Sequence, residues 1–112
     1  MNEVLAQLEA TLEQRKSASP EESYVASLHN KGLNKILEKV GEEAVELILA
    51  ARDLEQGGSR EALVGEAADL WFHTMVALSH LNVPLSDVSE CLAGRFNISG
   101  LDEKASRSPG TD

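Results

Sequence analysis

The amino-acid sequence predicts an all-α protein, an antiparallel helical bundle with two long central helices that is completed by dimerisation. Apolar residues recur at three- and four-residue steps along most of the chain, and no segment alternates as a β-strand does. Two long helical stretches, residues 33–55 and 60–81, are joined by a short loop, which favours antiparallel packing. Small helical chains often extend a modest core by dimerising.

The N-terminal part of the chain predicts two helices. The first is amphipathic and covers about residues 2–16. Its apolar residues are Val4, Leu5, Leu8 and Leu12. Ser19 is predicted to cap a short second helix with Pro20 in its first turn, because serine is a favoured N-cap and proline fits the first helical position. That helix runs through Leu28 and ends at Gly32, a natural C-cap.

The central and last helices have their own boundary signals. Ser59 follows Gln56-Gly-Gly and is predicted to cap the second long helix. Gly41 lies in the middle of the first, where glycine costs about 1 kcal/mol relative to alanine. Close approach of another helix or a ligand would explain it, and so would chance. Ser86 is predicted to start a last helix, with Leu85, Val88 and Leu92 on its apolar side.

Composition limits the class of protein. A chain of 112 residues is one domain, expected at 1–107 with a disordered tail at 108–112. The formal net charge of -9 disfavours a nucleic-acid surface, which needs a basic footprint. Cys91 is the single cysteine, so an intrachain disulfide is excluded and a reducing cytoplasm fits. The sequence has neither a signal-peptide pattern nor an apolar run that would span a membrane.

Two pairs of acids have the spacing of a metal site. Glu43 and Glu46 share one helix face, and Glu66 and Asp69 repeat the three-residue step on the next long helix. Such carboxylates favour Mg²⁺, with Mn²⁺ as an alternative, whereas a solvated acidic surface is the other interpretation. A di-iron site is disfavoured because it needs a Glu-x-x-His step on two helices.

Basic side chains precede the acids on the first long helix. Lys31, Lys35 and Lys39 step by four along one side, either as ordinary surface lysines or as phosphate ligands. His29 and His73 are candidates for further hydrogen bonds, although His73 fits a core histidine nearly as well. His80 and Cys91 are interpreted as structural.

Three segments resemble the phosphoribosyl-ATP pyrophosphohydrolase family, within the wider MazG-like all-α nucleotide pyrophosphohydrolases. They are Ser23-Tyr-Val-Ala-Ser-Leu-His-Asn-Lys-Gly32, Lys39-Val-Gly-Glu-Glu-Ala-Val-Glu46 and Glu66-Ala-Ala-Asp-Leu-Trp-Phe-His73. The resemblance implies hydrolysis of the α–β phosphoanhydride of phosphoribosyl-ATP, the second step of histidine biosynthesis. It also implies a homodimer in which helices of both subunits build each site.

The resemblance assigns roles to individual residues. The implied magnesium ligands are Glu43, Glu46, Glu66 and Asp69. The implied catalytic residues are Glu42 and Glu43, because Glu42 matches a carboxylate that positions or deprotonates the attacking water. The implied phosphate or substrate contacts are Lys31, Lys35, Lys39 and His73. Two other functions stay open: a house-cleaning nucleoside triphosphate pyrophosphohydrolase and a non-catalytic helical interaction module.

Overall fold

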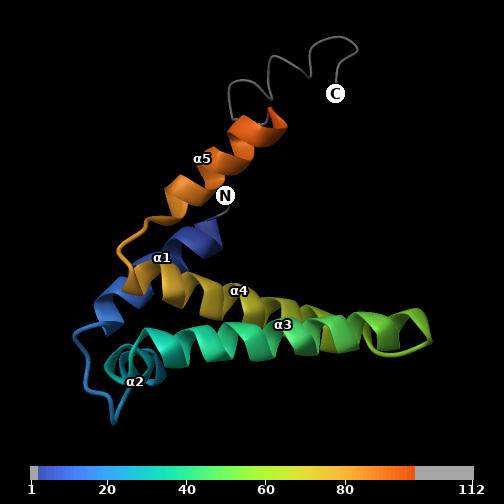
Figure 1. The fold of residues 1–112 in the computed structure, drawn as a ribbon, viewed down its shortest axis with the longest axis horizontal. Helices are drawn as coiled ribbons and strands as arrows, with labels where there is room; N and C mark the ends of the chain where they lie inside the picture. The colour runs from blue at the N-terminus through green and yellow to red at the C-terminus, as the bar shows by residue number, and fades with distance from the viewer. Residues whose placement is uncertain (1–2, 98–112) are drawn as a thin grey trace.

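The structure, a computed structural model, describes residues 3–97. This part of the chain forms helices and no strand, which confirms the all-α class (Figure 1). The helices are α1 (Glu3–Arg15), α2 (Tyr24–Lys31), α3 (Leu33–Glu55), α4 (Arg60–His80) and α5 (Leu85–Phe96). The predicted tail at residues 108–112 lies outside the described residues. Within residues 3–97, each helix is too short or too polar to cross a membrane.

The α3–α4 hairpin is the main structural unit. The two helices lie antiparallel along most of their length, α1 and α2 pack at one end of the hairpin, and α5 runs away from it (Figure 1). The turn needs glycine, because Gly57 has φ +94° and a Cβ on Gly58 would lie 2.7 Å from the Asp53 carbonyl oxygen. The Ser59 hydroxyl then accepts the Ala62 amide at 3.1 Å, which confirms the predicted cap of α4.

The hydrophobic core lies at the end of the hairpin that α1 and α2 cover. Its buried members come from four helices. They are Leu12 of α1, Val25 and Leu28 of α2, Ile36 of α3, and Met75 and Val76 of α4. Full burial of each such side chain contributes roughly 1.5–3 kcal/mol. The loop end of the hairpin has no comparable cover from another described element, so its facing side chains are free to line a site.

The start of α2 corrects the sequence-based prediction. Ser19 does not cap it; residues after Ser19 form a tight turn in which the Ser19 carbonyl accepts the Ser23 amide at 3.1 Å. Ser23 is the cap instead, because its backbone is extended and its hydroxyl accepts the Ala26 amide at 3.1 Å. Gly32 ends the helix as predicted, with φ 103°.

The start of α5 also differs from the prediction, by one residue. The helix begins at Leu85 rather than Ser86, and Pro84 occupies the cap position without a side-chain capping bond. The Leu85 amide donates instead to the Glu9 carboxylate of α1 at 2.7 Å. A distant residue therefore replaces the local cap, a contact that local sequence patterns do not reveal.

A pair of histidines joins α2 to the end of α4. The Nδ1 atoms of His29 and His80 lie 2.9 Å apart, and the rings stack with an interplanar angle of 15°. That distance requires one proton between the two nitrogens, so the pair is incompatible with two imidazolium rings. Burial lowers the pKa of His29, and the charges of His80 and Lys16 lower it further against the opposing Glu13.

The histidine pair predicts a loss of stability in acid. The folded-state pKa of His29 lies below its ordinary value of about 6.5, so the unfolded chain binds more protons below that pH. The contribution of the histidine pair to the free energy of unfolding should be at its maximum above about pH 6.5. It should decrease as the pH falls below that value. Urea unfolding between pH 5 and 8 measures this, and His29→Phe should flatten the dependence. The same slope in His29→Phe and in wild type would contradict this role.

Candidate functional site

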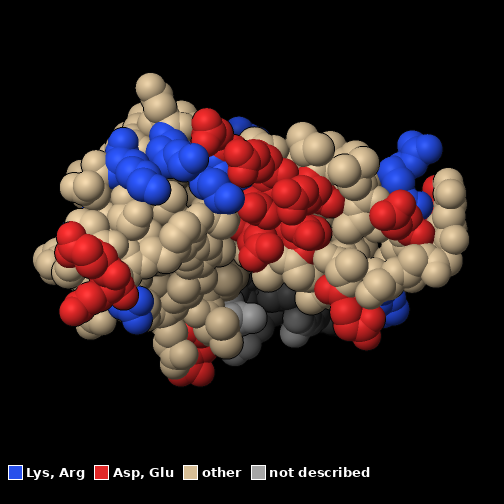
Figure 2. Space-filling view, turned by 90° about the horizontal axis from the view of Figure 1, so that it is seen from below, with Lys and Arg blue, Asp and Glu red and all other residues tan. Residues whose placement is uncertain are grey.

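Three carboxylates of the hairpin come together across the α3–α4 contact. Each of Glu43, Glu46 and Glu66 offers an oxygen, and these oxygens all lie within 4.8 Å of one another. Figure 2 shows an acidic patch in the middle of one face of the molecule, with basic side chains along one edge of the patch. We call these three residues the carboxylate cluster. The three-residue step places Glu43 and Glu46 on one face of α3, and the antiparallel hairpin brings Glu66 of α4 to that face.

The carboxylate cluster contains oxygens that protein groups leave unsatisfied. Glu43 is only 7% exposed. Glu43 Oε1 and Glu66 Oε1 are both buried and have no hydrogen-bond partner among the described residues. An unpaired buried carboxylate oxygen is costly, and native proteins normally satisfy such atoms. A hard divalent cation accepts this all-oxygen donor set, so the residues present fit Mg²⁺ or Mn²⁺.

The electrostatics of Glu66 reflect the same crowding. Burial raises the pKa of Glu66, and the charge of Glu46 together with a shared hydrogen bond raises it further. Asp69 and Glu43 contribute in the same direction. Repulsion between carboxylates is therefore built into the cluster, and added positive charge would relieve it.

The predicted lysine contacts fall at different places. Lys39 Nζ lies 3.3 Å from Glu42 Oε1 and 3.8 Å from Glu43 Oε2, so it adjoins the carboxylate cluster. The hydrogen bond to Glu42 raises the pKa of Lys39. Lys35 instead pairs with Glu38 at 2.7 Å, one turn farther from the cluster. Lys31 is exposed in the last turn of α2.

His73 and Asp69 lie beside the carboxylate cluster rather than in it. His73 is buried; its Nδ1 bonds the Asp69 carbonyl at 2.8 Å and its Nε2 bonds the Tyr24 hydroxyl at 2.8 Å. Because a carbonyl only accepts, Nδ1 carries the proton and Nε2 accepts from Tyr24. Both ring nitrogens are therefore engaged within the chain. The Asp69 side chain is exposed and outside the three-residue group, so its role as a ligand stays a prediction.

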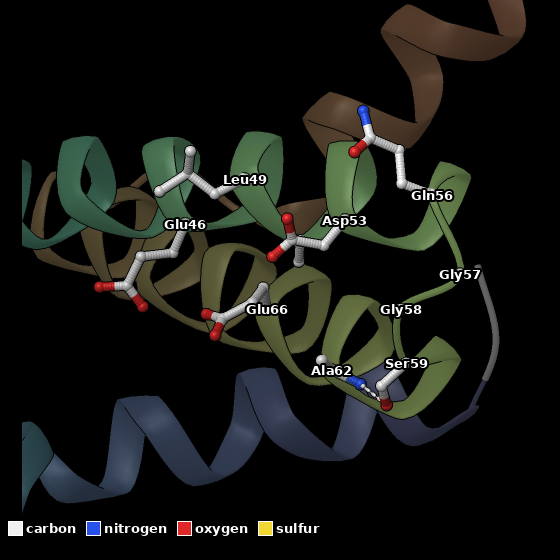
Figure 3. Close-up of a pocket in the computed structure, with 10 residues that line it drawn as sticks. Glu46, Leu49, Asp53, Gln56, Gly57, Gly58, Ser59, Ala62 and Glu66 are labelled. Atoms are coloured by element: carbon white, nitrogen blue, oxygen red, sulfur yellow. Dashed lines mark hydrogen bonds between the residues drawn. The ribbon is translucent and has the colours of Figure 1, made fainter.

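A cavity at the loop end of the hairpin was missed by sequence reasoning. It has a volume of about 650 Å³ and opens onto two members of the carboxylate cluster (Figure 3). Its lining includes Glu46, Leu49, Asp53, Ser59, Ala62 and Glu66. The available signal was the spacing of Glu46 and Asp53, which are seven residues apart and so lie two turns apart on one face of α3.

Fold and site together define an all-α protein with a cluster of carboxylates that fits a hard divalent cation, beside a cavity large enough for a small organic ligand. Comparison with known proteins makes this class specific. Residues 5–96 match the family model described as phosphoribosyl-ATP pyrophosphohydrolase, and the chain belongs to that family.

Individual relatives agree with the family model. A protein of Hydrogenovibrio crunogenus named phosphoribosyl-ATP pyrophosphatase is 53% identical over 107 residues, covering 96% of this chain and 95% of the relative. Proteins of two Burkholderia mallei strains with the same name are 51% identical over 105 residues, covering 94% of this chain and 86% of each relative. The chain thus spans nearly the whole of each of these relatives.

The carboxylate cluster predicts a metal-dependent gain in thermal stability. Saturating Mg²⁺ at about 100 times its Kd should raise the free energy of unfolding by about 2.7 kcal/mol. Glu43→Gln should abolish most of this gain, because it removes a charged ligand while keeping the shape of the side chain. Melting temperature with and without Mg²⁺ measures the effect. Glu55→Gln, an acid-to-amide change on α3 outside the cluster, is the matched control; equal gains in both variants would contradict the assignment.

Proposed function

We propose that this protein hydrolyses 1-(5-phosphoribosyl)-ATP to 1-(5-phosphoribosyl)-AMP and pyrophosphate, the second step of histidine biosynthesis. The observation that carries the proposal is the carboxylate cluster with its unsatisfied buried oxygens, in a chain of this family. The names of the relatives supply the substrate. A biosynthetic role and a lone exposed cysteine fit a cytoplasmic enzyme.

The proposed reaction breaks the α–β phosphoanhydride of the substrate. A water oxygen bonds to phosphorus, the bridging bond breaks, and pyrophosphate leaves with the electron pair of that bond. Mg²⁺, when held by the carboxylate cluster with Asp69 as a fourth ligand, supplies positive charge for the phosphate oxygens and lowers the pKa of water. Mn²⁺ fits the same ligands.

Side chains next to the carboxylate cluster have proposed roles of their own. Lys39 places an ammonium group beside Glu43, where it can neutralise a phosphate oxygen. Lys35 lies one turn before Lys39 on α3 and Lys31 lies in the last turn of α2, and both are proposed as further phosphate contacts. Glu42 is bound to Lys39 and half exposed, so it can orient the attacking water and accept its proton.

His73 has a supporting role in this proposal. Its two hydrogen bonds link Tyr24 of α2 to the backbone of α4, one turn after Glu66. The substrate contact predicted from the sequence would require one of these bonds to break. We therefore place His73 as a residue that positions α4 under the carboxylate cluster.

The house-cleaning alternative would use the same carboxylates on a non-standard nucleoside triphosphate. Family membership favours phosphoribosyl-ATP over that substrate class, and it disfavours a non-catalytic interaction module. A substrate panel with ATP and deoxynucleoside triphosphates separates the two enzymes, because only the proposed one discriminates strongly for the additional phosphoribosyl group.

We also propose that the protein works as a homodimer. An apolar stripe on α3, formed by Leu37, Val45 and Ile48, is 47%, 55% and 59% exposed. The three lie within a narrow sector of the helix that faces away from the core, a pattern typical of an interaction surface. Gly41 lies in the same stripe, and a Cβ there would meet no atom of residues 3–97 within 4 Å. That free space suits a second helix packed closely against α3.

Catalysis should depend on both metal and carboxylates. Purified protein should release pyrophosphate from phosphoribosyl-ATP rapidly with Mg²⁺ and only at background rate with chelator. Glu66→Gln should lower kcat by about 10²-fold or more, the usual effect of losing a charge-stabilising group. A coupled pyrophosphate assay measures the rates, with Glu55→Gln as control. An inactive wild type would contradict the proposed function, whereas activity equal to wild type in Glu66→Gln would contradict the role of Glu66 in it.

The apolar stripe should control the oligomeric state. Ile48→Glu introduces a charge into the proposed interface and should shift the mass in solution from two chains toward one. Light scattering coupled to size-exclusion chromatography measures this shift. Ala10→Glu, at an exposed position of α1, should leave the mass unchanged. A monomeric wild type would contradict the proposed homodimer, whereas a dimer unaffected by Ile48→Glu would place the contact elsewhere.

A further inference from the structure

We propose that the cavity at the loop end of the α3–α4 hairpin holds the ribose and base next to the cleaved phosphates, with the Asp53 carboxylate as the group that binds the ribose hydroxyls. The proposal rests on the proposed function, because it divides that substrate between two parts of one site. It adds a specificity-determining residue on α3, two turns beyond Glu46.

The order of charges along α3 supports this division. Lys35 and Lys39 lie on one side of Glu43 and Glu46, and the cavity lies on the other. With a rise of about 1.5 Å per residue, Lys39 and Asp53 are separated by roughly 21 Å of helix. A substrate whose phosphates meet the carboxylate cluster and the lysines can therefore place the rest of its length in the cavity.

The charge of the cavity supports the same orientation. Its lining, within the described residues, carries the acids Glu46, Asp53 and Glu66 and no lysine or arginine. A phosphate group entering the cavity would meet like charge, whereas hydroxyl and amine groups would meet acceptors. The cavity therefore favours the hydroxyl-bearing, aromatic part of a nucleotide over its phosphates.

Asp53 has the chemistry that a ribose needs. In Figure 3 its carboxylate points along the hairpin toward Glu66, into the space in front of α4. An ionised carboxylate accepts hydrogen bonds through both oxygens and can bind two neighbouring hydroxyls at once. Leu49, Ala50 and Ala62 supply apolar surface on the same cavity, against which a base can pack. At about 650 Å³ the volume lies within the range of small-molecule sites.

The two products provide a direct test, since each represents one half of the substrate. Asp53→Ala should raise the KM for phosphoribosyl-ATP and the inhibition constant of phosphoribosyl-AMP about tenfold, the effect of losing a hydrogen bond to a charged group. The inhibition constant of pyrophosphate and kcat should stay within about twofold. Calorimetric binding of phosphoribosyl-AMP should weaken by the same factor. Glu55→Ala, an acid in the same turn region, is the matched control.

Other outcomes would overturn the proposal. Equal weakening of both products, or no change in either, would exclude Asp53 as a ribose contact. Loss of the Mg²⁺-dependent rise in melting temperature in Asp53→Ala would make Asp53 a metal ligand instead. Asp53→Asn keeps the size of the side chain, so it replaces Asp53→Ala in the same measurements if the alanine variant does not fold. An inactive wild type would contradict the proposed function itself, whereas an active wild type with an unaltered Asp53 variant would overturn only this assignment.

Discussion

The mutual repulsion of three carboxylates in the carboxylate cluster is the constraint on which the rest of the structure depends. Glu43 is almost wholly buried, and within residues 3–97 one oxygen each of Glu43 and Glu66 has no hydrogen-bond partner. Such a cluster destabilises the chain that contains it unless a cation is present. The fold must therefore hold α3 against α4 by other means, and those contacts lie away from the cluster. The site is stable because the hairpin is anchored elsewhere.

The anchoring contacts surround the carboxylate cluster on the side of α1 and α2. The core built around Ile36 and Val76 fixes the two long helices against each other. Tyr24 and His73 then tie α2 to α4 through a hydrogen-bonded pair one to two turns from Glu66. The loop end, in contrast, is held among the described residues only by its glycine turn and the Ser59 cap, which leaves room for the cavity. Rigid packing at one end and open space at the other suit a site that must admit a long substrate.

Much of the fold could be predicted from the sequence because its boundaries are local. Gly32 and Ser59 mark their helix ends by conformational preference and by a capping hydroxyl, and both act as predicted. The prediction of Ser19 as the cap of α2 was wrong because the sequence has two serines, four residues apart, and either one is a favoured N-cap residue. The choice of Ser23 depends on its burial under the rest of the fold. The start of α5 depends on Glu9, far away in sequence, so no local pattern could reveal it.

The candidate site, like the fold, could be predicted only as far as local sequence patterns reach. Helical periodicity placed Glu43 and Glu46 on one face of α3, but the approach of Glu66 to α3 across the hairpin, which leaves Asp69 at the margin, is a tertiary property. The pairing of Lys35 with Glu38 and the role of Asp53 in the cavity also require the folded chain. Residue types indicated the chemistry of the site, whereas the packing of α3 against α4 determined which of the predicted side chains lie close together.

A crystal structure of the protein soaked with Mn²⁺, with anomalous diffraction recorded near the manganese edge, would examine the carboxylate cluster most directly. Manganese replaces magnesium in oxygen ligand sets and gives an anomalous signal that identifies it. The expected result is a peak bonded to oxygens of Glu43, Glu46 and Glu66, and the same map would show whether Asp69 completes the ligand set. An ordered cluster with no peak, or a peak bound only to other residues, would contradict the assignment of these three carboxylates as the metal site.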